Sequence, residues 1–149
     1  MNRTKILTGL LDLRKIPYEE IRDPNNQLMR VFISNFVSLE RQEAFLLNLN
    51  RRGNKQKRME YSKHFSAIRR LDLENGNCSL LDWISSHGRD SCYVLWNTPK
   101  DGALLFSPHR LLDIELSYFG DGYLCNFSMN KVIAVTLDNE IYVVERNAN

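Results

Sequence analysis

The stretch "KVIAVTLDNEIYVVER", residues 131–146, decides the fold class of this chain. Two apolar runs flank Asp138 and Asn139, a pair that suits the two-residue turn of a β-hairpin. If Leu137 pairs with Glu140, both faces of the hairpin are apolar: Val135/Tyr142 and Ile133/Val144 share one face, and Ala134/Val143 share the other. Such a hairpin belongs inside a sheet that helices or a partner chain cover, at least in part, on both sides.

The residues before the hairpin extend this sheet. "SCYVLW" (91–96) and "GALLF" (102–106) read as strands, and "NTPKDG" between them supplies Pro and Asp-Gly for a turn. "GYLCNF" (122–127) is a further strand that leads into the hairpin. Ser107-Pro108 fits the start of a short helix through Leu111 and Leu112.

Helical spacing dominates the first half of the chain. Thr4 can cap a helix that ends near Pro17 and carries an apolar stripe of Ile6, Leu7, Leu10 and Leu11. Ser38 can open a second helix that ends at Gly53 and turns inward Leu39, Phe45, Leu46 and Leu49. Two further helices are expected: one with a stripe of Tyr61, Phe65 and Ile68, and one that follows a capping-box variant at Ser79–Asp82 and ends at Gly88.

One segment of this half favours a strand instead. Residues 28–36, "LMRVFISNF", alternate Met29, Val31 and Ile33 with Arg30, Phe32 and Ser34. We therefore expect a single α+β domain over residues 1–149, in which N-terminal helices pack on a mainly antiparallel C-terminal sheet.

The composition is that of an ordinary globular protein. A chain of 149 residues buries about 70% of its unfolded surface, and 43% of the residues here are hydrophobic and 26% charged. Cys78, Cys92 and Cys125 are an odd number without tight pairing, which suits a reducing cytoplasm. The apolar run near the N-terminus is interrupted by Asp12, Arg14 and Lys15, so we expect neither a signal peptide nor a membrane span.

Charge is concentrated in residues 51–70, around "NRRGNKQKRMEYSKHF" (50–65). This stretch holds one acid, Glu60, and eight bases: Arg51, Arg52, Lys55, Lys57, Arg58, Lys63, Arg69 and Arg70. Three readings stay open: a solvated helix face, a contact with nucleic acid, or a contact with an acidic protein partner. The candidate partner-binding residues are Arg51, Arg52, Lys55, Lys57 and Arg58.

No catalytic or metal-binding set accompanies this charge. Zinc ligand types occur at His64, Cys78, His87 and Cys92, but without the paired spacing of a zinc site. Cys125 with His109 and either Asp113 or Asp121 could form a nucleophile pair, yet nothing selects these residues. Asp113 and Glu115 are better explained as solvated charges than as metal ligands, and "FGDGY" (119–123) as a turn. We therefore expect a non-enzymatic protein with no metal and no cofactor.

The C-terminal part, "CYVLWNTPKDGALLF" followed by "DGYLCNFSMNKVIAVTLDNEIYVVER", resembles the sheet of small bacterial immunity proteins. These proteins serve as partners in polymorphic-toxin and contact-dependent growth inhibition systems, and the resemblance covers about residues 91–146. It implies a cytoplasmic toxin inhibitor that binds a cognate protein toxin, and it transfers no individual contact residue. Immunity proteins against nuclease toxins are usually acidic, whereas this chain has a net charge of +2. The alternative function is a nucleic-acid-binding or regulatory protein that uses residues 51–70.

Overall fold

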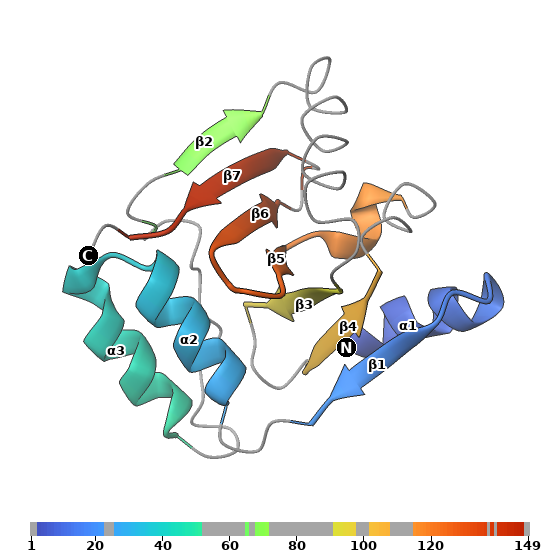
Figure 1. Cartoon of the computed structure of the whole chain (residues 1–149), viewed down its shortest axis with the longest axis horizontal. Helices are drawn as coiled ribbons and strands as arrows, with labels where there is room; N and C mark the ends of the chain where they lie inside the picture. The colour runs from blue at the N-terminus through green and yellow to red at the C-terminus, as the bar shows by residue number, and fades with distance from the viewer. Residues whose placement is uncertain are drawn as a thin grey trace.

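The computed structural model describes residues 3–22, 26–51, 65, 68–71, 91–97, 102–107, 115–136, 138 and 140–147. Within these ranges seven strands form one antiparallel sheet in the order β1-β4-β3-β5-β6-β7-β2 (Figure 1). The strands are β1 (Tyr18–Ile21), β2 (Ile68–Leu71), β3 (Cys92–Trp96), β4 (Ala103–Phe106), β5 (Gly122–Asn126), β6 (Lys131–Val135) and β7 (Ile141–Glu145). The helices are α1 (Arg3–Leu13), α2 (Gln27–Phe36), α3 (Leu39–Leu49) and the 3-10 helix η5 (Leu116–Phe119). The predicted α+β class is confirmed.

The β6–β7 hairpin lies inside the sheet, as its two apolar faces predict, but its predicted register is wrong by one residue. Val135 pairs with Ile141, so Thr136 rather than Leu137 lies opposite Glu140. Two hydrogen bonds select this register: Thr136 N–H donates to the Glu140 carbonyl at 2.9 Å, and Glu140 N–H donates to Thr136 Oγ1 at 3.1 Å. The corrected pairs are Val132/Val144 and Ala134/Tyr142 on one face, and Ile133/Val143 and Val135/Ile141 on the other.

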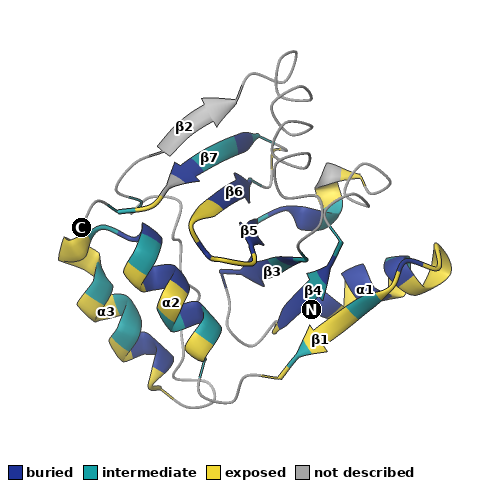
Figure 2. Cartoon of the chain, in the orientation of Figure 1, coloured by how far each residue is buried: buried dark blue, intermediate teal, exposed yellow. Residues whose placement is uncertain are grey.

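Each face of the sheet is covered by a different helical layer. On one face, Leu7 and Leu11 of α1 and Phe119 of η5 pack in one cluster with the sheet residues Trp96, Leu104, Leu124 and Ile133. On the other face, Phe32 and Ile33 of α2 and Leu49 of α3 pack with Leu95, Tyr123, Cys125 and Val132. Figure 2 shows the resulting contrast between buried central strands and the largely exposed β1 at the sheet edge.

Residues 28–36 form most of helix α2, so the predicted strand is wrong. The buried residues of α2 are Met29, Phe32, Ile33 and Phe36, which lie at i, i+3, i+4 and i+7 on one helical face. Val31, which the strand pattern placed beside Met29 and Ile33, is 43% exposed. Met29 and Ile33 would share one face in a strand and also share one face in a helix, so these two residues do not distinguish the structures. Phe36 distinguishes them, because it joins Met29 and Ile33 on one face only in a helix.

The third predicted helix is also wrong at its two described positions. Phe65 forms an isolated antiparallel bridge with Val37, and Ile68 begins strand β2. Strand β1 was not assigned from the sequence, because Glu19 and Glu20 give it a polar character.

Two helix ends also differ from their predictions. Thr4 lies inside α1 rather than at its cap, since the helix begins at Arg3. Helix α3 begins after Ser38 as predicted, but it ends at Leu49 with Asn50 as its C-terminal cap, before Gly53. Leu39, predicted to point inward, is 80% exposed, and the buried residues of α3 are Asn48 and Leu49 at its other end. The helix predicted near Ser79–Gly88 falls outside the described residues, and of the one predicted at Ser107–Leu112 only Ser107 is described.

Candidate functional site

Part of the sheet face that carries α2 and α3 remains accessible toward the edge strand β1. The strand registers place Glu19 of β1, Leu105 of β4 and Tyr93 of β3 side by side in one row. Glu19 is exposed, while Leu105 and Tyr93 are half-buried. Phe127, directly after β5, is 55% exposed and stacks on Tyr93 with ring centroids 5.6 Å apart and planes 15° apart. We call these four residues the sheet-face patch.

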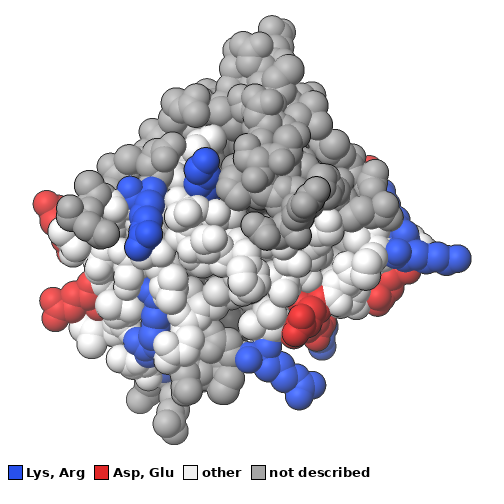
Figure 3. Space-filling model, viewed as in Figure 1, with Lys and Arg blue, Asp and Glu red and all other residues white. Residues whose placement is uncertain are grey.

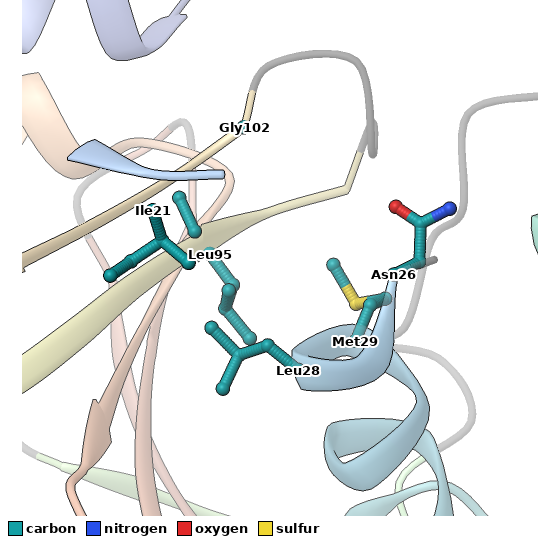
Figure 4. Close-up of a pocket in the computed structure, with 7 residues that line it drawn as sticks. Ile21, Asn26, Leu28, Met29, Leu95 and Gly102 are labelled. Carbon is teal, nitrogen blue, oxygen red and sulfur yellow. The ribbon is translucent and has the colours of Figure 1, made fainter. Parts of the chain in front are cut away.

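A small pocket lies beside the sheet-face patch, between the sheet and the start of α2. Its walls come from Ile21, Ala103 and Leu95 on three strands and from Leu28 and Met29 on α2, and Asn26 and Gly102 complete the lining. Figure 4 shows the side chains of Ile21, Leu95 and Leu28 meeting in this space. The pocket has a volume of about 60 Å³. Sites for small-molecule ligands are usually about 300–1,000 Å³, so this pocket suits a single short aliphatic side chain.

Glu19 is the charged residue of the sheet-face patch, and it influences Tyr93. Partial burial and, secondarily, the negative charge of Glu19 raise the pKa of the Tyr93 phenol. Tyr93 therefore stays neutral at physiological pH and keeps its hydroxyl proton as a hydrogen-bond donor. Figure 3 shows both acidic and basic side chains around the lower right of the molecule, where β1 lies, beside a largely uncharged surface across the middle of this view.

The two described cysteines are buried and unreactive in character. Burial raises the pKa of the Cys92 thiol to about 12 and that of the Cys125 thiol well above its ordinary value. Cys92 belongs to the cluster under α1 and Cys125 to the cluster under α2, so the two side chains lie on opposite faces of the sheet. Since the thiolate is the nucleophilic form, these burial effects disfavour the Cys125 nucleophile considered from the sequence.

The remaining candidates for chemistry fall into two groups. Asp121 lies in the turn before β5 with φ 62°, which agrees with the turn predicted for "FGDGY", and Glu115 is exposed. His64, Cys78, His87, His109 and Asp113 lie outside the described residues. Within the described ranges, no three His, Cys, Asp or Glu residues are grouped so that they could hold a metal ion. No described helix is long and apolar enough to cross a membrane.

The predicted basic site is described only at its first residue. Arg51 is exposed directly after α3, whereas Arg52, Lys55, Lys57 and Arg58 lie outside the described residues. The chain on either side of this segment contacts the same helix. Arg30 of α2 donates a hydrogen bond to Asn50 Oδ1, and Phe65 pairs with Val37 immediately after α2.

Phe65 is held at this point by aromatic packing. Its ring lies 6.0 Å from that of Phe32 and 5.7 Å from that of Tyr123, centroid to centroid, with an edge-to-face arrangement in both cases. Such pairs add about 0.5–1.5 kcal/mol beyond area burial. The described residues on either side of the basic segment, Asn50 and Phe65, thus both lie beside α2.

The sequence pattern did not point to the sheet-face patch. In the sequence, Tyr93 and Phe127 look like ordinary aromatic residues of separate strands. They lie close together because β3 pairs with β5, and Glu19 lies in the row of Tyr93 because β1 pairs with β4. No protein-family model matches the sequence, and the comparisons with curated proteins and with solved structures give no match. The resemblance of residues 91–146 to immunity proteins thus remains an expectation from the sequence.

Proposed function

We propose that this chain is a non-enzymatic protein-binding module that binds and neutralises a cognate bacterial toxin in the cytoplasm, in the manner of an immunity protein. The observation that carries the proposal is the accessible Tyr93–Phe127 stack on the sheet face. Aromatic side chains are enriched at the energetic centres of protein–protein interfaces, where a large rigid ring loses little conformational entropy on binding. The resemblance of residues 91–146 to immunity proteins supplies the class of partner.

The chemistry of the described residues supports binding rather than covalent catalysis. Cys92 and Cys125 are buried thiols with raised pKa values. The pocket near β1 is too small for most small-molecule substrates. These features leave the accessible aromatic and aliphatic surface as the best candidate for a function of this region.

The charge beside the aromatic stack favours a protein over a nucleic acid at this surface. Proteins that stack bases on exposed aromatics usually surround them with Lys and Arg, which neutralise phosphate. Here the charged member of the row is the carboxylate of Glu19. The basic residues Arg51, Arg52, Lys55, Lys57 and Arg58 are proposed as a second contact region, for an acidic part of the same toxin.

The test begins with a search of the genes beside that of this chain for a large toxin, whose toxic domain is then purified. We expect the two proteins to form a complex in isothermal titration calorimetry and the toxin to lose activity in proportion to the complex formed. Protection that is complete only at stoichiometric amounts supports a binder. Protection at far lower amounts would indicate an enzyme, and absence of both binding and protection at micromolar concentrations would refute the proposal.

A set of five substitutions distinguishes the nucleic-acid alternative. In this variant Gln replaces Arg51, Arg52, Lys55, Lys57 and Arg58. If these residues serve a protein partner, the variant should associate with the toxin more slowly, because charge mainly sets the association rate. If they bind nucleic acid, the unsubstituted protein should bind duplex DNA with an affinity that falls by about 0.9 log units per phosphate contact for each tenfold rise in salt. Tight DNA binding near physiological salt that the variant loses would favour the alternative.

A further inference from the structure

The pocket and the sheet-face patch lie two residues apart along the strands, which matches the side-chain spacing of an extended polypeptide. Ile21 and Glu19 are two residues apart on β1, Ala103 and Leu105 are two apart on β4, and Leu95 and Tyr93 are two apart on β3. Two residues along a strand span about 6.8 Å, and side chains i and i+2 of an extended segment project to the same side at that interval. The side chain of residue i of a bound extended segment can therefore enter the pocket while the side chain of residue i+2 reaches Glu19.

The pocket end of this surface selects an aliphatic group. The five residues that form its walls, Ile21, Leu28, Met29, Leu95 and Ala103, are all apolar, and its volume is about 60 Å³. A branched side chain such as Leu or Val fills such a space and removes apolar surface from water on both partners, at about 25 cal/mol per Å². A charged group placed there would lose most of its hydration, and Asn26 is the only polar side chain among the lining residues that it would meet.

The other end selects a cation. The exposed Glu19 carboxylate lies in the same row as the half-buried Tyr93 ring, which Phe127 supports by stacking. A guanidinium group can contact Glu19 and Tyr93 at once, because its N–H groups donate to a carboxylate while its plane lies flat against an aromatic ring. A phosphate or a carboxylate at this position would instead be repelled by Glu19.

We propose that the sheet-face patch and its pocket bind an extended segment of the protein partner that carries an aliphatic side chain and, two residues away, an arginine or lysine. This inference rests on the proposed function and specifies the chemistry of the partner. A toxin with a basic surface fits it, since the complementary charge on this chain is Glu19. Binding through this surface is independent of the contact proposed for the basic segment.

A peptide experiment tests the surface without the toxin. The probes are acetyl-Leu-Gly-Arg-amide and the charge-reversed acetyl-Leu-Gly-Glu-amide, titrated into the ¹⁵N-labelled protein and followed by NMR. We expect the arginine peptide to bind with millimolar affinity and to shift the amide signals of β1, β3, Gly102 and Phe127. We expect the glutamate peptide to bind more weakly. Equal binding of the two peptides, or shifts confined to other parts of the chain, would overturn the proposal.

Neighbouring glutamates on β1 provide a matched pair of variants. Glu19 and Glu20 are both exposed, but successive strand residues project to opposite faces of the sheet. Glu19→Gln should weaken binding of the arginine peptide by about two- to fivefold, as expected for an exposed ion pair. Glu20→Gln should leave it unchanged. Equal effects of the two substitutions would mean that general charge, rather than the sheet-face patch, attracts the peptide.

The toxin complex then separates this inference from the proposed function. Phe127→Ala should weaken the complex, whereas Leu39→Ala, which shortens another exposed apolar side chain, should not. A toxin that binds equally to both variants refutes the inference and the use of the Tyr93–Phe127 stack, but it leaves standing that the chain binds the toxin. A protein that binds the arginine peptide as expected but does not bind or neutralise the toxin refutes the proposed function instead. Self-association through the patch, seen as a concentration-dependent loss of the Phe127 signal, would also count against a partner segment.

Discussion

Trp96 in β3 and Thr4 in α1 are joined by a buried hydrogen bond, in which the indole N–H donates to Thr4 Oγ1 at 3.0 Å. The neighbouring Arg3 lies over the same ring, with its guanidinium carbon 5.3 Å from the ring centroid. Arg3 also donates a hydrogen bond to the carbonyl of Gly120, in the turn before β5. The first turn of α1 is therefore tied to strand β3 and to the turn before β5, both far away in the sequence.

Removal of the Thr4 hydroxyl measures how much the hydrogen bond with Trp96 contributes to the free energy of unfolding. Thr4→Val keeps the shape of the side chain but leaves the Trp96 N–H unsatisfied, so we expect the free energy of unfolding to fall by about 1–3 kcal/mol. Thr8→Val is the comparison, because Thr8 is equally buried but its hydroxyl bonds the Lys5 carbonyl of the same helix and the partly exposed Tyr18 rather than Trp96. Urea unfolding followed by circular dichroism measures both variants. Equal losses would show that the Trp96 bond contributes little.

Gly122 should tolerate no side chain. A Cβ at this position would lie 2.6 Å from the Phe119 carbonyl oxygen and 2.8 Å from the Trp96 ring. We therefore expect Gly122→Ala to destabilise the protein by about 1–3 kcal/mol or more. Gly9→Ala on α1 meets no atom within 4 Å and should stabilise by up to about 1 kcal/mol through helix propensity. Thermal unfolding that shifts in the same direction for both variants would contradict this account.

Two substitutions distinguish the helix at residues 27–36 from the strand expected from the sequence. In a strand Val31 and Ile33 would share a face, whereas α2 leaves Val31 43% exposed and buries Ile33 completely. Ile33→Asn should therefore cost about 2–5 kcal/mol, and Val31→Asn less than about 1 kcal/mol. Chemical denaturation provides the comparison. Similar losses at the two positions would argue against the helical assignment.

The buried thiols should make the protein less stable in alkali. An unfolded cysteine loses its proton near pH 9, whereas the folded-state pKa is about 12 for Cys92 and is raised well above the ordinary value for Cys125. Between these values the folded state holds protons that the unfolded state has released. Stability is thus fully present below pH 9 and falls as pH rises, by up to about 1.4 kcal/mol per pH unit for each thiol.

Comparison with Cys92→Ala isolates this effect from other groups that titrate in the same range. Urea unfolding at pH 8, 9 and 10 should give a flatter decline for the variant, even if its stability at pH 8 is lower because of the lost side-chain volume. Parallel declines would mean that the thiol of Cys92 does not cause the pH dependence. Peptide mapping after alkylation of the native protein provides a second readout, since Cys92 and Cys125 should label slowly.

The central strands were predictable because local patterns and tertiary environment agree there. Strands β3 to β7 carry apolar runs between turn signals, and most of their residues belong to the two core clusters on either face of the sheet. The two edge strands were not predictable in this way. Glu19 and Glu20 in β1 and Arg69 and Arg70 in β2 give the edges a polar composition, and only pairing with distant strands places them in the sheet.

The candidate site was harder to predict than the fold. Its four residues come from three strands and from the end of β5, so their proximity depends on the strand order rather than on any spacing in the sequence. Residues 51–70, by contrast, stand out in the sequence because a run of Lys and Arg is a local feature. A stacked Tyr93–Phe127 pair creates no such local signal, because each aromatic residue alone is typical of a buried strand.

The strand order also governs when the sheet can form during synthesis. Strand β1 can pair only after β4 has been synthesised, because Tyr18 pairs with Phe106. Strand β2 can pair only after β7 has been synthesised, because Ile68 pairs with Val144. At about 5–20 residues per second, a ribosome needs about 4–14 s to add the roughly 70 residues between Leu71 and Ile141. During that interval the apolar face of α2 has no completed sheet to cover it. The nascent chain therefore exposes apolar surface until β7 has been synthesised. Chaperones that bind exposed apolar segments can act during this interval.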